Sequence, residues 1–165
     1  MLAAITQVLN QDSDTQVDVC MTSEMARRIE LWTAMYEDNA PWVDRKKVKS
    51  AQLPAAIASE VARLVTLEMK SEITGGSSAT YLNEQYQKKV LKSIRRYVEY
   101  GCAKGGLILK PYVTKTGLAI QYVQADCFFP LAFDDSGQIQ QCVFTEQFRK
   151  GQKIYTRLEV HTLQG

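Results

Sequence analysis

Residues 94–123, IRRYVEYGCAKGGLILKPYVTKTGLAIQYV, contain the point at which the pattern of apolar residues changes its period. Before Lys104 the apolar residues recur every three to four positions, which is typical of a helix with one buried face. After Gly106 they alternate in steps of two, which predicts strands. We therefore expect an α+β fold, with helices before this point and strands after it.

On the carboxyl side of this point the sequence predicts an antiparallel β meander over 105–165. Two hairpins are expected, each formed by two alternating runs around a glycine-containing turn. Their strands are 107–113 with 118–123, and 139–148 with 153–163. Between the hairpins a short apolar strand, 126–133, ends at Asp134-Asp135-Ser136-Gly137, which is a strong turn signal.

On the amino side we expect three helices within 22–104. The first begins at Ser23, a good N-cap residue, and the second opens on Leu53 and Pro54. The third and longest begins at Ser77 or Ser78 and continues through Gly101. Residues 1–21 are expected to form a mobile acidic arm, because 10–20 are polar, acidic and without a period.

The second helix carries an apolar stripe that the spacing predicts to face the core. The stripe is formed by Ile57, Val61, Leu64 and Val65, with Ala58 and Ala62 beside it for close contact with another helix. Glu68 continues the same stripe, so its carboxylate is expected at the edge of the core. An unpaired buried carboxylate is costly, which makes Glu68 a candidate for a buried ion pair, with a catalytic role as the alternative.

Length and composition exclude several classes of protein. With 165 residues, 45% hydrophobic and 23% charged, the chain has the composition of one ordinary globular domain. No apolar run approaches the roughly 18 residues of a membrane span, so we expect an intracellular chain without a membrane partner. The four cysteines show no C-x-x-C spacing, and we expect them to be buried thiols.

The residues of common catalytic sites are not assembled in this sequence. The phosphate-binding loop, the serine nucleophile elbow and the H-E-x-x-H motif are all missing. The single histidine, His161, falls on the polar side of the last strand and is expected at the surface. Asp134 and Asp135 are better explained by their turn than by a metal. We therefore expect no enzyme, with no catalytic, cofactor-binding or metal-binding residues and no cofactor.

Charge is segregated along the chain although the net charge is only +2. Residues 1–44 hold 8 acidic and 2 basic residues, whereas residues 85–110 hold 7 basic and 1 acidic. Basic residues near the C-terminal half of a helix suit its dipole, so a structural explanation suffices for them. Contact with phosphates is the alternative, and a non-enzymatic nucleic-acid-binding module would use helix 85–104. The candidate phosphate contacts are Lys88, Lys89, Lys92, Arg95 and Arg96.

Four segments together resemble the N-terminal part of portal proteins of long-tailed, double-stranded DNA bacteriophages. They are LWTAMYEDNAPW (31–42), LPAAIASEVARLVTLEMKSEITG (53–75), YLNEQYQKKVLKSIRRYVEYGCAKGGLILKPYV (81–113) and IQYVQADCFFPLAFDDSGQIQQCVFTEQFRKGQKIYTRLEVH (120–161). The likeness runs in unbroken order over roughly 23–165 and is a whole-pattern match without a catalytic signature. It implies a wing-like region of such a protein.

The resemblance implies a structural subunit of a homo-oligomeric ring. Such a ring lies at the capsid vertex where the head joins the tail, and it forms part of the conduit for DNA packaging and ejection. The implied partners are further copies of the chain, capsid and head-morphogenesis proteins, and double-stranded DNA bound without sequence preference. The terminase and tail connector would be contacted through the stem and clip, which come later in portal proteins. We therefore expect a fragment or a truncated prophage product, located in the virion and, during assembly, in the host cytoplasm.

Overall fold

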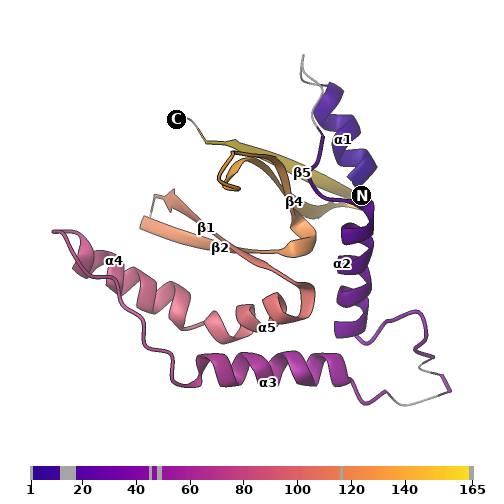
Figure 1. The fold of residues 1–165 in the computed structure, drawn as a ribbon, viewed down its shortest axis with the longest axis horizontal. Coiled ribbons are helices and arrows are strands. Elements are labelled where there is room, and N and C mark those ends of the chain that lie inside the picture. Colours follow the sequence, from indigo (N-terminus) through magenta and orange to yellow (C-terminus); the bar gives the residue numbers. More distant parts are fainter. Residues whose placement is uncertain (1, 12–17, 45, 48–49, 116, 164–165) are drawn as a thin grey trace. The chain divides into compact units, whose positions relative to one another are not determined.

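The computed structural model describes residues 2–11, 18–44, 46–47, 50–115 and 117–163 (Figure 1). Its helices are α1 (Leu2–Gln11), α2 (Ser23–Tyr36), α3 (Leu53–Leu67), α4 (Ala79–Tyr86) and α5 (Ile94–Lys104), with a π-helical segment at Gln87–Leu91. Its strands are β1 (Leu107–Thr114), β2 (Gly117–Gln124), β3 (Phe128–Phe133), β4 (Ile139–Lys150) and β5 (Lys153–Thr162), with a 3-10 turn at Ala125–Cys127. The predicted α+β class is confirmed.

The strands form two sheets in place of the one meander that the sequence predicts. The β1 and β2 strands pair as a two-stranded sheet, and β3, β4 and β5 form a three-stranded sheet in that order, all antiparallel. The sheets belong to two compact units, 1–30 with 126–165 and 31–125. Each unit contains helices and strands, so the expected division into 22–104 and 105–165 follows the chain but not its compact units.

The core of the first unit lies between α1 and the three-stranded sheet. Ile5 of α1 is 3% exposed and packs with Phe129, Leu131 and Val143, of which Val143 is fully buried. The expected mobile arm over 1–21 is therefore wrong for 2–11, because Ile5 and Leu9 give this stretch an apolar face that packs on the sheet. Residues 12–17 of that arm lie outside the described part of the chain.

The turn between β3 and β4 is organised by one carboxylate. Asp134 Oδ1 accepts hydrogen bonds from the Ser136 amide (2.8 Å), the Ser136 hydroxyl (2.6 Å) and the Gln138 amide (2.9 Å). Its Oδ2 accepts a fourth from the Gln140 side chain at 2.9 Å. These bonds, that of the Ser136 side chain first, lower the pKa of Asp134 to about 2.

We expect Asp134→Asn to weaken the fold at neutral pH, with a difference from wild type that disappears in acid. The folded-state pKa of Asp134 lies below its ordinary 3.8, so the ionised carboxylate stabilises the fold above pH 3.8. That contribution is lost as the pH falls towards about 2. Thermal unfolding of both proteins across this range, with an NMR titration of the carboxyl group, measures the effect. Parallel curves for the two proteins would contradict this assignment.

In the second unit, α3 and the β1–β2 hairpin contact opposite sides of α5 (Figure 1). The predicted hairpin is confirmed, with Leu107 opposite Gln124 and Thr114 opposite Gly117. The α3 helix opens on Leu53 and Pro54 as predicted, but it ends at Leu67, earlier than the glycines that the sequence suggests as its end.

The expected long third helix is broken into α4, the π-helical segment and α5. The break coincides with contacts from β2: the Tyr122 hydroxyl donates to the carbonyls of Lys89 and Val90, at 2.8 and 3.2 Å. Lys89 Nζ in turn donates to the Leu118 carbonyl. Carbonyl groups that a π-helical turn displaces from the regular ladder need other donors, and β2 supplies one.

A group of tyrosines joins α2, α5 and β2 within this unit. The Tyr97 and Tyr122 rings stack with centroids 3.5 Å apart, and Tyr100 meets both Tyr36 and Tyr97 edge to face. The Tyr36 hydroxyl donates to Glu99 at 2.7 Å. Burial, followed by this hydrogen bond, raises the pKa of Tyr36 well above its usual value.

Gly105→Ala is expected to destabilise the chain more than Gly137→Ala does. Both glycines have positive φ, 86° and 80°, and this conformation costs other residues roughly 1–2 kcal/mol. A Cβ at Gly105 would also lie 3.1 Å from the Trp32 ring, whereas nothing lies within 4 Å of one at Gly137. The two unfolding free energies in urea give the comparison. Equal losses would mean that Trp32 does not pack against the end of α5.

Candidate functional site

An exposed row of aliphatic side chains runs along α3. Ile57, Leu64 and Val65 are 62%, 58% and 59% exposed, and Val61 is 40% exposed. The prediction that this stripe faces the core is therefore wrong. Ala58 and Ala62 are the buried residues of α3, and the helix packs on α5. Together with Leu53, the four exposed side chains form what we call the α3 apolar face.

Packing distance explains why the alanines are buried and the larger residues are not. Two helices approach most closely where the side chains between them are small. Ala62 is fully buried, and an aliphatic side chain at that position would push α3 away from α5. The larger residues therefore lie on an adjacent side of α3, where this chain offers them little cover.

Glu68 does not form the buried ion pair that the sequence predicts. It is exposed and occupies the C-cap position of α3, with φ −115°. The expectation assumed that the stripe of Val61, Leu64 and Val65 is buried. Because that stripe is exposed, the Glu68 carboxylate at its end meets solvent and needs no partner within the fold.

A charged pair borders the α3 apolar face. The Arg63 guanidinium donates two hydrogen bonds to the Glu60 carboxylate, at 2.8 and 2.7 Å. This contact lowers the pKa of Glu60 and raises that of Arg63, and Arg95 of α5 adds to the effect on Glu60. Since the two charges neutralise each other, the border of the face is polar without a net charge.

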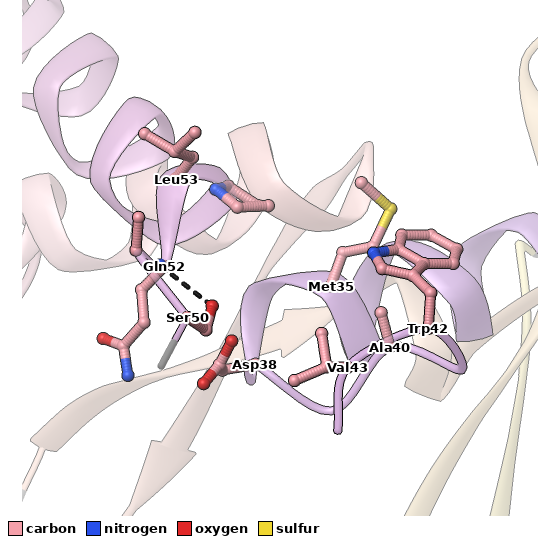
Figure 2. Close-up of a pocket in the computed structure, with 10 residues that line it drawn as sticks. Met35, Asp38, Ala40, Trp42, Val43, Ser50, Gln52 and Leu53 are labelled. Carbon is pink, nitrogen blue, oxygen red and sulfur yellow. Dashed lines mark hydrogen bonds between the residues drawn. The ribbon is translucent and has the colours of Figure 1, made fainter. Parts of the chain in front are cut away.

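A pocket of about 170 Å³ lies beside the start of α3 (Figure 2). Met35 and Trp42 lie on one side of it, and Ser50, Gln52 and Leu53 lie on the other. Trp42 is 66% exposed. Leu53 belongs both to the pocket and to the α3 apolar face, so the apolar surface extends from α3 towards Trp42.

The five candidate phosphate contacts do not share one free cationic surface. Lys88 pairs with Glu84 at 3.3 Å, and Lys89 is half-buried against the Leu118 carbonyl. Arg96 donates to the Tyr100 hydroxyl at 3.0 Å, which raises the pKa of its guanidinium, and it lies 5.7 Å from the centre of that ring. Lys92 and Arg95 are exposed.

His161 lies at the surface, as the sequence predicts, and its neighbours are Glu159 and Cys142. Its Nε2 is 2.7 Å from the Glu159 carboxylate, and the strand register places it opposite Cys142. This histidine beside a cysteine is not expected from the sequence pattern, although the turn between Lys150 and Lys153 fixes the register that pairs them. The three residues lie on one face of an open sheet.

The thiols are more accessible than the sequence analysis expects. Cys20 and Cys102 are exposed, Cys127 and Cys142 are half-buried, and all four are free of disulfides. Cys20 donates to the Leu131 carbonyl at 2.9 Å, which ties the segment before α2 to β3. The prediction of buried thiols is therefore wrong.

The part of the chain that the structure describes was searched for metal sites and for membrane-spanning helices. Among those residues no group of three or more His, Cys, Asp or Glu side chains is placed to hold a metal ion. No helix there is both long and apolar enough to cross a membrane.

Comparison with known protein families, with curated proteins and with solved structures finds no match.

Proposed function

We propose that this chain is a structural subunit that assembles side by side with further copies of itself into a ring, as the N-terminal part of a phage portal protein does. The observation that carries the proposal is the α3 apolar face. Scattered apolar residues are normal on a protein surface, but a contiguous apolar row usually marks an interaction site. Five neighbouring aliphatic side chains along one helix are such a row.

The free energy that this face can contribute by burial favours a ring of many copies over a dimer of two copies. Completing the burial of each half-exposed aliphatic side chain contributes on the order of 1 kcal/mol. Bringing two proteins together costs about 4–15 kcal/mol in lost freedom, so five such side chains only begin to offset that cost. In a ring each copy has two neighbours, and closure adds contacts without further loss of freedom.

The neighbour that we propose for this face is another copy, bound through a different surface. The acidic excess of 1–44 and the basic excess of 85–110 place opposite charges on different segments of one chain. Complementary charges on different surfaces favour head-to-tail contacts, which close into rings, over two-fold contacts between identical patches.

The rest of the portal assignment follows from the resemblance over roughly 23–165. We propose a place at the capsid vertex, contact with capsid and head-morphogenesis proteins, and passage of double-stranded DNA through the completed ring. We propose a non-catalytic role because His161 and Cys142 lie on one open face of a sheet. The alternative of a nucleic-acid-binding module built on helix 85–104 is weakened, because Lys89 and Arg96 make contacts within the chain.

Sedimentation velocity and negative-stain electron microscopy of the purified 165-residue chain test this proposal. We expect a mass that rises with concentration and ends at closed rings of one size. A monomer at all concentrations, or a symmetric dimer that grows no further, would contradict the proposal. Robust hydrolysis of nucleoside triphosphates or esters would contradict its non-catalytic part.

A further inference from the structure

The β4–β5 hairpin concentrates positive charge beyond the core of its unit. Every residue from Glu146 to Arg157 is exposed, whereas Val143 and Thr145, earlier in β4, are buried. This exposed stretch contains four of the five basic residues of 111–165, namely Arg149, Lys150, Lys153 and Arg157. The neutral balance of 111–165 in the sequence therefore conceals a local cationic surface.

Two lysines and two aromatic rings share one face of this hairpin. Lys150 is opposite Lys153, and Phe148 is opposite Tyr155, at positions that alternation places on the same side of the ribbon. The two rings stack with centroids 5.7 Å apart and planes 16° apart. We call Phe148, Lys150, Lys153 and Tyr155 the basic hairpin face. The ion pair between Glu146 and Arg157 closes it at the end nearer the core.

The stability of the hairpin does not explain this arrangement. Like charges directly opposite each other destabilise an antiparallel pair, and Lys150 and Lys153 are such a pair. Within the described ranges of the chain, neither lysine forms an ion pair, so their charge is not neutralised. Phe148 and Tyr155 are 47% and 43% exposed beside them. A ligand with negative charge would relieve the repulsion.

We propose that the basic hairpin face binds the phosphate backbone of nucleic acid without reading its sequence. Cations interleaved with exposed rings are the usual composition of surfaces that bind nucleic acid. A two-stranded ribbon is also narrow enough to enter the major groove of a duplex, which is about 12 Å wide. This inference rests on the DNA contact that the proposed function includes and assigns that contact to a surface, while ring assembly itself neither requires nor excludes it.

The test compares two double variants of the full 165-residue chain that remove the same charge. Lys150→Gln with Lys153→Gln changes the basic hairpin face, and Lys88→Gln with Lys92→Gln changes the helical region. Fluorescence anisotropy measures binding to a labelled duplex of about 20 base pairs and to a single strand of the same length, from about 20 to about 200 mM salt. An equal concentration of polyglutamate replaces the DNA in a third arm.

For the wild type we expect the logarithm of affinity to fall linearly with the logarithm of salt concentration, with a slope of about −3 on duplex DNA. For the hairpin variant the slope should fall in magnitude by about 2, to about −1, whereas the helix variant should keep the wild-type slope. Tighter binding to the single strand, lost in Phe148→Ala, would assign base stacking to the rings. Tighter binding to the duplex would assign groove contact, and either result supports the proposal.

Three results would overturn the proposal. They are no binding to either DNA at the lowest salt, equal losses in the two double variants, and polyglutamate binding as tight as DNA binding. The last would identify an acidic protein as the partner. Each of these results would leave the ring proposal intact, because ring assembly is measured by particle mass and not by DNA binding.

Discussion

We expect Leu64→Glu to abolish the proposed self-association of the chain and to leave its fold intact. Leu64 is 58% exposed in the α3 apolar face, so a carboxylate there costs the single chain little. In an assembled ring the same carboxylate would be buried among aliphatic side chains without a partner, and such burial costs several kcal/mol. We expect sedimentation velocity to show a monomer at concentrations where the wild type assembles.

The matched control for this variant is Ala56→Glu. Ala56 is exposed on the same helix but lies outside the α3 apolar face, and the substitution adds the same charge. We expect the control to assemble like the wild type, and both variants to unfold at similar urea concentrations. Assembly by Leu64→Glu at wild-type concentrations would show that α3 does not form the contact between copies.

Ala62→Leu should destabilise the second unit by about 1–3 kcal/mol, because it adds three carbon atoms to a site without free volume. Ala62 is fully buried in α3, which packs on α5. Leu64→Ala removes a comparable volume from the exposed side of the same helix, and we expect it to cost less than about 1 kcal/mol. Urea unfolding of the two variants measures both free energies.

A larger cost for Leu64→Ala is expected if Leu64 lies in the core, as the sequence predicts. With Leu64 in the core, Leu64→Ala would cost about 2–5 kcal/mol. A larger loss for Leu64→Ala would therefore show that α3 is rotated about its axis relative to the structure described here.

The hairpins were predictable because their signals are local. Alternation over a few residues defines a strand, and the turns at Gly117 and Gly151 have the positive φ that glycine permits. The register across β4 and β5 then follows from the turn, which is why the pairing of Cys142 with His161 was available in the sequence. The separation into two sheets was not, since it depends on contacts that follow no local pattern.

The helices show what a periodic pattern leaves undetermined. A stripe of large aliphatics and a stripe of alanines both recur along α3 at helical spacing. Which stripe is buried depends on how closely α5 approaches, and that information lies outside the helix. The break in the third helix has a similar origin, because the Tyr122 hydroxyl that caps the carbonyls of Lys89 and Val90 comes from β2.

The candidate site was the least predictable part. Block counts of charge directed attention to Lys88, Lys89, Lys92, Arg95 and Arg96, yet the same counts gave 111–165 as neutral. In the folded chain the first group is partly used in internal contacts, while Lys150 and Lys153 are brought face to face by a turn. The net charge of a stretch of sequence therefore does not predict the charge of the surface that its residues form after folding.

Photo-cross-linking from α3 shows whether copies of the chain meet through the α3 apolar face. A photoreactive benzoylphenylalanine at position 64 keeps the face apolar, and mixing labelled with isotopically heavy copies separates cross-links between chains from those within one chain. We predict cross-links from position 64 of one copy to a surface outside α3 of another. Cross-links confined to α3 of both copies, or none between chains, would contradict assembly of a ring through this face.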